Sequence, residues 1–316
     1  RTYKNEMLLP TRLIPEKHRH LNVITFLDFL NTRLELTSEF IKGLDYHMKD
    51  DYGSDAATVS ALAGIHYFAC RPYYDEVVEL FSPPEGNNYF IKKMSDKLNN
   101  DQVLTRHLVK KINETTDGFK VEIADIANQQ VKVVNTKKII YAGQKHALKY
   151  IYPPGYELFT DNNIAPWMVV NVVIKNELEK IGYWQNEMLT DDTTFLGFVD
   201  SDTQHSGSAY RVLTGYYCLP PSSREDLINV EENKATIAEM TADHMSDYFK
   251  EDIQSLIERV DIKVMGHAMP IPKPGYLFND KNSLSQNPNI RYAGVDNGRL
   301  PLLFEALDSG LNSALH

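Results

Sequence analysis

The chain has 316 residues, of which 42% are hydrophobic and 24% charged, the composition of a globular protein with one large core or two moderate ones. Its formal net charge of −10 argues against a nucleic-acid partner, because binding to phosphates requires a basic face. No apolar run approaches the roughly 18–20 residues of a membrane span, so none is expected.

The first hundred residues show helical periodicity. Residues 21–51 carry apolar side chains at three- and four-residue steps, which predicts one helix, broken by the sequence DDYGSD that starts at Asp50. Residues 56–71 predict a second apolar helix, with small residues on one face. Residues 82–98 predict a turn followed by an amphipathic helix.

After residue 100 the period changes to two. The stretch 101–143 predicts three short strands, with Asp117-Gly118 as the turn between the first two. The last strand, Lys138 to Tyr141, stops at Ala142-Gly143. This stretch therefore predicts a small antiparallel sheet.

From residue 144 onward the pattern mixes apolar strands with one long helix. Strands are predicted at 165–175, 193–202 and 210–219, and the span 222–258 is predicted to be mostly helix. A further strand begins at residue 259 and is ended by prolines. The sequence thus predicts an α+β fold in which mixed sheet and helices form the larger part.

The C-terminal residues 290–316 predict a strand ending in Ala293-Gly294, then Asp296, a glycine turn and a helix from about Leu302. A strand, a glycine, an acid and a helix N-terminus in this order are typical of a nucleotide-cofactor site. The chain lacks the motifs G-x-G-x-x-G, G-x-x-x-x-G-K-[ST], G-x-S-x-G and H-E-x-x-H, and Cys70 and Cys218 have no metal-ligand spacing. No metal is expected.

Several of these segments, in this order, resemble the FAD-dependent amine-oxidase superfamily. PEGNNYFIKKMSDKL resembles its P-G-G-x-x-x-L-x-x-x-L helix, the stretch 103–148 its β-meander, and IRYAGVDNGRLPLLFEALDSGLNSAL its C-terminal cofactor motif. The segments APWMVVNVVIK, LGFVDSDTQ, VDIKVMGHAMPIPKPG and LFEALDSGLNSA resemble a bacterial branch of uncharacterised flavin-containing oxidoreductases. The resemblance extends from about residue 21 to the C-terminus.

The resemblance implies that the chain is the substrate-binding and C-terminal part of a flavoenzyme that oxidises a C–N (or C–C) bond by hydride transfer to FAD. A substrate-type domain would comprise residues 1–82 and 146–285, and a partial FAD/NAD(P)-binding α/β domain residues 83–145 and 286–316. The expected substrate is a small molecule, such as an amine. The residues expected to contact the cofactor are Ala142, Gly143, Gly294, Asp296, Leu303 and Phe304. Because a shared cofactor edge requires both Ala-Gly strands, the segments 139–143 and 291–294 are expected to be neighbours in space.

The chain departs from the family pattern in three places. The N-terminal ADP-binding βαβ unit is missing, Ala-Gly-Gln stands at 142–144 where the family often has Ala-x-Pro, and Glu305 stands where many members have glycine. The βαβ unit would bind the pyrophosphate, so FAD is expected to be bound weakly or not at all by this chain. Dimerisation through the uncovered apolar sheet face is also expected.

Two cofactor residues allow an ordinary structural explanation as well. Asp296 would accept a hydrogen bond from a ribityl or ribose hydroxyl, or it is a helix N-cap or an Asx-turn at Asn297-Gly298. Gly143 allows a flat cofactor to approach the backbone, or it ends a strand in an ordinary turn. The last helix would direct free N–H groups at the cofactor, or it packs Leu303, Phe304 and Leu307 on the core.

Aromatic residues could line an amine pocket or simply fill the core. The candidates are Tyr67, Trp184, Tyr216 and Tyr217, and alternation along the strand places the last two on opposite faces.

Two residues near the predicted proline-ended strand are catalytic candidates. His267 could orient substrate or act as an acid or base, unless it is a core histidine, and Lys273 resembles the lysine that some amine oxidases place near the flavin.

Other functions remain open from sequence alone. The chain could be a flavin-free ligand- or partner-binding module, or one subunit of a split flavoenzyme that pairs with a separate ADP-binding chain. It starts at Arg1 rather than methionine, which suggests processing, cleavage or truncation. The expected location is cytoplasmic, or periplasmic if a leader was removed upstream.

Overall fold

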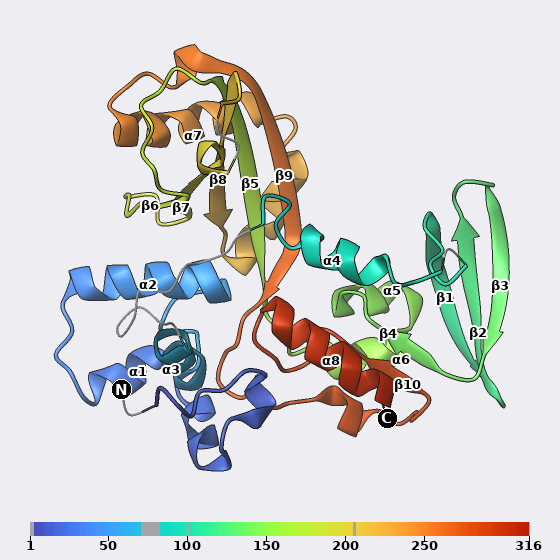
Figure 1. Ribbon diagram of the computed structural model, residues 1–316. Helices are drawn as coiled ribbons and strands as arrows, with labels where there is room; N and C mark the ends of the chain where they lie inside the picture. Colours follow the sequence, from blue (N-terminus) through green and yellow to red (C-terminus); the bar gives the residue numbers. More distant parts are fainter. Residues whose placement is uncertain (1–2, 71–82, 100, 205–206, 316) are drawn as a thin grey trace. The chain divides into compact units, whose positions relative to one another are not determined.

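The structure, a computed structural model, describes residues 3–70, 83–99, 101–204 and 207–315 (Figure 1). It contains two compact units, each assembled from separate stretches of chain. Unit 1 comprises Arg1–Arg19, His66–Asn162 and Gly275–His316, and unit 2 comprises His20–Ile65 and Asn163–Pro274.

The units differ from the predicted domain boundaries. Residues 3–19, 66–70, 146–162 and 275–285 belong to the unit that contains the β-meander, whereas the sequence grouped them with the substrate-type domain. The roles of the units stay a prediction.

Unit 2 is built on a five-stranded antiparallel sheet with the order β6-β7-β8-β5-β9. Its strands are β5 (Ile164–Lys175), β6 (Gln185–Glu187), β7 (Phe195–Asp200), β8 (Tyr210–Cys218) and β9 (Ile257–Pro270). The predicted strands at 165–175, 193–202, 210–219 and from 259 onward are therefore confirmed to within a few residues.

One face of this sheet is covered by α7 (Lys234–Phe249), which Figure 1 shows alongside the strands. Met168, Val170 and Val172 alternate along β5 and belong to the apolar cluster on this face. Gly215 on β8 lets the helix approach closely, because a Cβ there would lie 2.9 Å from Thr241 Cγ2. The predicted helix 222–258 is shorter than expected: a 3₁₀ segment occupies Pro221–Asn229, and α7 ends at Lys250 in the left-handed region.

The helices of unit 2 correct another prediction. Residues 21–51 do not form one helix but a 3₁₀ segment, α1 (Phe26–Asn31) and α2 (Ser38–Tyr52). Thr25 and Thr37 each accept a hydrogen bond from a backbone N–H in the first helical turn, so each starts a new helix. The apolar residues keep a helical spacing across the helix starts at Thr25 and Thr37, so the spacing alone predicted one continuous helix. α3 (Ala61–Cys70) crosses the boundary between the units, and the predicted helix end at Arg71 lies outside the described residues.

Unit 1 contains a three-stranded antiparallel meander and a separate two-stranded parallel sheet. The meander is β1 (His107–Thr115), β2 (Gly118–Asp125) and β3 (Gln130–Thr136), with the first turn at Thr116-Asp117, one residue before the predicted Asp117-Gly118. The predicted last strand is β4 (Ile139–Tyr141), which leaves the meander and pairs with β10 (Ile290–Tyr292). The helices of this unit are α4 (Asn88–Ser95), α5 (Leu148–Ile151), α6 (Pro153–Tyr156) and α8 (Leu303–Leu315).

The core of unit 1 joins these parts. Ile112 and Phe119 from the meander pack with Leu148, Phe159 and Tyr292 in one apolar cluster. Phe159 and Tyr292 meet edge to face, with ring centroids 5.1 Å apart. This packing fixes β10 beneath the meander. Among the described residues, no helix is both long and apolar enough to cross a membrane.

Candidate functional site

The parallel pairing of β4 with β10 creates the candidate site. Ile139 pairs with Ile290 and Tyr141 with Tyr292, and the N–H of Ala293 donates to Tyr141 O at 2.9 Å. The turns Ala142-Gly143 and Ala293-Gly294 follow directly, so both lie at the same end of this sheet. The expectation that 139–143 and 291–294 are neighbouring elements is confirmed. We call these two turns, together with Asp296, the Ala-Gly edge.

A lysine that the sequence analysis did not single out occupies the Ala-Gly edge. Lys145 is fully buried, and its Nζ donates to Gly143 O at 3.1 Å, Ala293 O at 2.6 Å and Asp296 Oδ1 at 2.9 Å. Its backbone N–H donates to Asp296 Oδ2 at 2.8 Å. The three acceptors match the three N–H groups of an ammonium ion. Burial lowers the pKa of Lys145, and the charge of Asp296 opposes this effect.

Asp296 is therefore engaged by this chain itself. Both of its carboxylate oxygens accept from Lys145, and its carbonyl oxygen accepts from Asn162 Nδ2 at 2.7 Å. It does not cap the last helix, because α8 begins only at Leu303. Its side-chain bonds run to a residue 151 positions away rather than to the neighbouring turn.

Both glycines of the Ala-Gly edge are covered by side chains of this chain. A Cβ on Gly294, which has φ +130°, would lie 2.9 Å from Asp296 Oδ1 and 3.2 Å from Lys145 Nζ. A Cβ on Gly143 would lie 2.8 Å from the hydroxyl of Tyr141, which donates to Gln144 O. In this chain Lys145 fills the space beside Gly294 and engages the carboxylate that a ribityl hydroxyl would need, so a flavin contact at this edge requires Asp296 to exchange its partner.

The loop after Asp296 is held by Asn297. Its side chain accepts from the N–H of Lys281 at 2.8 Å and donates to Asp280 Oδ1 and to Tyr292 O. Gly298 has φ +73°, and a Cβ there would lie 2.8 Å from the backbone of Asn279. Close packing of two backbone segments, rather than a cofactor, explains this glycine.

The first turn of α8 carries a buried carboxylate. Glu305 is fully buried and accepts from the N–H of Thr11 at 2.6 Å and from Arg299 Nη1 at 3.1 Å. Arg299 also donates to Asp308, which pairs with Arg12. These bonds attach the N-terminal segment to α8. Glu305 thus contributes a structural ion pair at the position where the family pattern has glycine.

The orientation of α8 rules out the alternative explanation, in which the helix packs Leu303, Phe304 and Leu307 on the core. These two residues are 54% and 42% exposed, and Leu303 is intermediate. The helix instead buries Glu305, Ser309 and Ser313. Ser309 Oγ accepts from the N–H of Gly294 at 3.0 Å, which draws this polar face towards the Ala-Gly edge. The residues that α8 exposes are Phe304, Leu307, Leu311 and Leu315, which we call the α8 apolar face.

The predicted substrate tyrosines on β8 lie in two different clusters. Tyr216 packs with Trp167 on one face of the sheet, and Tyr217 joins the opposite cluster, where its hydroxyl bonds to Thr241. The predicted opposition of the two is confirmed. Tyr216 is hydrogen-bonded to Gln185 and to Tyr46, and burial raises its pKa to about 12.

The other predicted site residues are divided between the units. Tyr67 is buried in unit 1. Trp184 is 40% exposed in unit 2, where its Nε1 donates to Gln204 at 3.1 Å. His267 lies on β9 and Lys273 just beyond it, both partly buried in unit 2, whereas the cofactor candidates lie in unit 1.

Lys145 was missed because a lysine four residues past a strand end is ordinary in sequence. The one available signal was its position after Ala142-Gly143, opposite an acid that follows a second Ala-Gly pair. A buried carboxylate needs a charged or hydrogen-bonding partner, so a buried Asp296 would imply a cation such as Lys145 close by.

Comparisons with known proteins show likeness in fold. Neither a protein-family model nor a curated protein matches this sequence. Among solved structures, wild-type putrescine oxidase bound to putrescine matches with a TM-score of 0.66 at 13% identity, covering 95% of this chain and 69% of that one. Cyclohexylamine oxidase from Brevibacterium oxydans IH-35A matches with 0.60 at 13% identity, covering 95% and 68%. An oxidoreductase from Methanosarcina mazei matches with 0.61 at 11% identity, covering 95% and 70%.

The fold of this chain is therefore that of solved amine oxidases over nearly its whole length. This agrees with the resemblance that the ordered sequence segments indicated. About three tenths of each matched structure has no counterpart here, since the alignments cover 68–70% of those chains.

Proposed function

We propose that this chain is the substrate-binding and C-terminal part of an oxidoreductase of the amine-oxidase type, which works with FAD only when an ADP-binding βαβ unit is also present. The observation that carries this is the pairing of β4 with β10 within the shared fold. It brings together two Ala-Gly turns that are 151 residues apart in the sequence, together with Asp296, which follows the second turn. A shared cofactor edge requires this arrangement.

The substrate of the proposed enzyme is a small molecule with an oxidisable C–N or C–C bond. The amine that the matched putrescine oxidase binds makes an amine the first class to test. His267, Lys273 and Tyr216 stay candidates for the substrate side. The α8 apolar face supports the need for a further part, because an uncovered apolar stripe favours a protein contact.

The second candidate is a flavin-free binding module. Lys145 favours it, because a lysine fully enclosed at the Ala-Gly edge replaces a cofactor contact with an internal one. In this case the chain has the amine-oxidase fold, but the Ala-Gly edge stabilises the protein instead of binding a cofactor.

The test compares two products of the coding region. The 316-residue chain is expected to show little flavin absorbance and weak uptake of FAD, whereas a product that extends upstream and contains G-x-G-x-x-G is expected to bind FAD tightly. Losing several charge-assisted hydrogen bonds of about 1.5–3 kcal/mol each lowers the affinity by orders of magnitude. An upstream region without that motif, or an extended product without flavin, would leave the binding module as the function. Stoichiometric, tightly bound FAD on the 316-residue chain would contradict both readings of the edge.

A further inference from the structure

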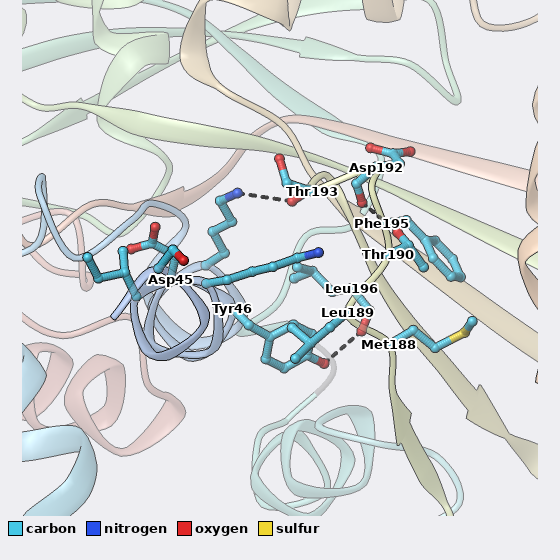
Figure 2. A pocket seen from close by; sticks show the side chains of 13 residues that line it. Asp45, Tyr46, Met188, Leu189, Thr190, Asp192, Thr193, Phe195 and Leu196 are labelled. Carbon is cyan, nitrogen blue, oxygen red and sulfur yellow. Dashed lines mark hydrogen bonds between the residues drawn. The ribbon is translucent and has the colours of Figure 1, made fainter. Parts of the chain in front are cut away.

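Unit 2 contains a pocket that has no role in the proposed function, whose Ala-Gly edge belongs to unit 1. The pocket has a volume of about 270 Å³. It lies between α2 and the segment 188–196, whose side chains are drawn in Figure 2. α2 presents to it side chains spaced by three or four residues, which lie on one helical face. These residues are Ser38, Ile41, Lys42, Asp45, Tyr46 and Lys49.

The wall of the pocket is mostly apolar and well fixed. Met188, Leu189, Phe195 and Leu196 line it opposite the helix. The Tyr46 hydroxyl donates to Leu196 O at 2.7 Å, a bond drawn in Figure 2, and holds the ring in place. A closed 150 Å³ cavity admits benzene, so a site of this size accepts roughly one ring with a short side chain.

The two carboxylates at the pocket are committed to the fold. Asp45 accepts from the N–H of Ala56 at 2.9 Å, and burial raises its pKa. Asp192 accepts from both the N–H and the hydroxyl of Thr194, at 2.9 and 2.6 Å. Its second oxygen lies 3.7 Å from His244 Nε2. Neither carboxylate is placed to hold a ligand cation as its main partner.

The two lysines differ from the acids in having spare donors. Lys49 Nζ donates to Thr193 O at 3.0 Å. Lys42 Nζ lies 4.0 Å from Asp191 Oδ1, beyond hydrogen-bond distance, and is 44% exposed. An ammonium has three N–H groups, so towards the described residues each lysine keeps at least two that can bind an anion.

We propose that this pocket binds a small carboxylate with an apolar body of about one ring. The carboxylate accepts from Lys42 and Lys49, which lie seven residues apart on one face of α2. The apolar body packs against Met188, Phe195 and Leu196. The site belongs to unit 2 and does not depend on FAD.

The experiment titrates the 316-residue chain with three probes of similar shape: phenylacetate, 2-phenylethanol and phenethylamine. Affinity is measured by calorimetry, and the place of binding by the methyl NMR signal of Met188, assigned with Met188→Leu. Phenylacetate is expected to bind most tightly and to shift the Met188 signal. Its affinity is expected to fall as salt rises, because both contacts are ionic. Equal or tighter binding of either other probe, or an unchanged Met188 signal, would overturn the proposal.

Variants assign the charge. Lys49→Gln, which keeps a donor for Thr193 O, is expected to weaken phenylacetate binding about tenfold or more. Lys42→Met is expected to weaken it a few-fold, because an exposed ion pair contributes less. The control Lys263→Met, on the exposed part of β9, leaves affinity unchanged. If Lys49→Gln does not fold, the affinity of Lys42→Met for phenylacetate and the salt dependence of the wild type test the proposal. An affinity that changes with neither the substitution nor the salt concentration would refute the site. A flavin result in the proposed-function test leaves this outcome unaffected.

Discussion

Lys145 Nζ lies 2.9 Å from Asp296 Oδ1, and the backbone N–H of Lys145 lies 2.8 Å from the other oxygen of the same carboxylate. One residue thus satisfies both oxygens of an acid 151 positions away, through its side chain and its backbone. The pair ties the segment after β4 to the segment after β10, at the point where the parallel sheet ends.

Replacing Lys145 by methionine is expected to destabilise unit 1 by about 3–5 kcal/mol. The substitution leaves the buried Asp296 carboxylate without its cation, and an unpaired buried charge is costly. Urea unfolding followed by circular dichroism measures the change. Lys149→Met, at an exposed position on α5, is the matched control and is expected to stay within about 0.5 kcal/mol. Recovery of stability in Lys145→Met/Asp296→Asn would confirm that the charge is the cause; a loss below about 1 kcal/mol in the single variant would disprove it.

Arg211 plays a comparable part in unit 2. Its fully buried guanidinium donates to both oxygens of buried Asp200, and Nη1 donates to the carbonyls of Leu178 and Glu179. Arg211→Met is expected to cost about 3–5 kcal/mol for the same reason.

Tryptophan fluorescence can follow this variant, because Trp167 and Trp184 both lie in unit 2. The matched control is Arg259→Met, whose 68% exposed side chain pairs with Asp261 and should contribute less than about 1 kcal/mol. Similar unfolding midpoints for the two variants would show that the buried ion pair contributes no more to the free energy of unfolding than the exposed one.

His66 makes stability depend on pH. Burial lowers its pKa from 6.5 to about 4, and the side chain is 3% exposed. The unfolded chain binds this proton more tightly than the folded one, so unfolding takes up a proton between these values. The free energy of unfolding is therefore expected to fall as pH drops from about 6.5 to about 4, by about 3 kcal/mol at most.

His66→Gln is expected to flatten that part of the pH profile, measured by urea unfolding at several pH values. His20→Gln, at an exposed position, should leave the profile as in the wild type. Parallel profiles for the wild type and His66→Gln would show that other groups cause the dependence.

The α8 apolar face is expected to make the purified chain associate. Leu307→Ser/Leu311→Ser should shift the protein towards monomer in size-exclusion chromatography with light scattering, because it removes two apolar side chains from the centre of the face. Stability should change little, since both residues are exposed. Ile228→Ser, 80% exposed in unit 2, is the control. A wild type that is already monomeric at high concentration would rule this out.

The strands were predictable because their signals are local. β5 is a run of apolar, mostly β-branched residues, and β4 and β10 each end in Ala-Gly, which was enough to predict that they are neighbours. The helix over 21–51 was wrong, because apolar periodicity outweighed Thr25 and Thr37, which begin new helices.

The contents of the site were less accessible to sequence reasoning. The Lys145–Asp296 pair and the orientation of α8 both depend on partners far along the chain. Glu305 faces inward because Thr11 and Arg299 bind it, and Ser309 because Gly294 does. A helical wheel of α8 alone assigns the apolar side to the core, which is the opposite of what the structure has.

The sequence separation of β4 and β10 has a consequence for synthesis. A ribosome adds about 5–20 residues per second, so β4 waits roughly 8–30 s for its partner after it is made. Throughout this interval all of unit 2 beyond residue 163 is being translated and the unpaired strand is open to other chains. A stop codon even a few dozen residues early would remove β10 and leave β4 without its pairing strand.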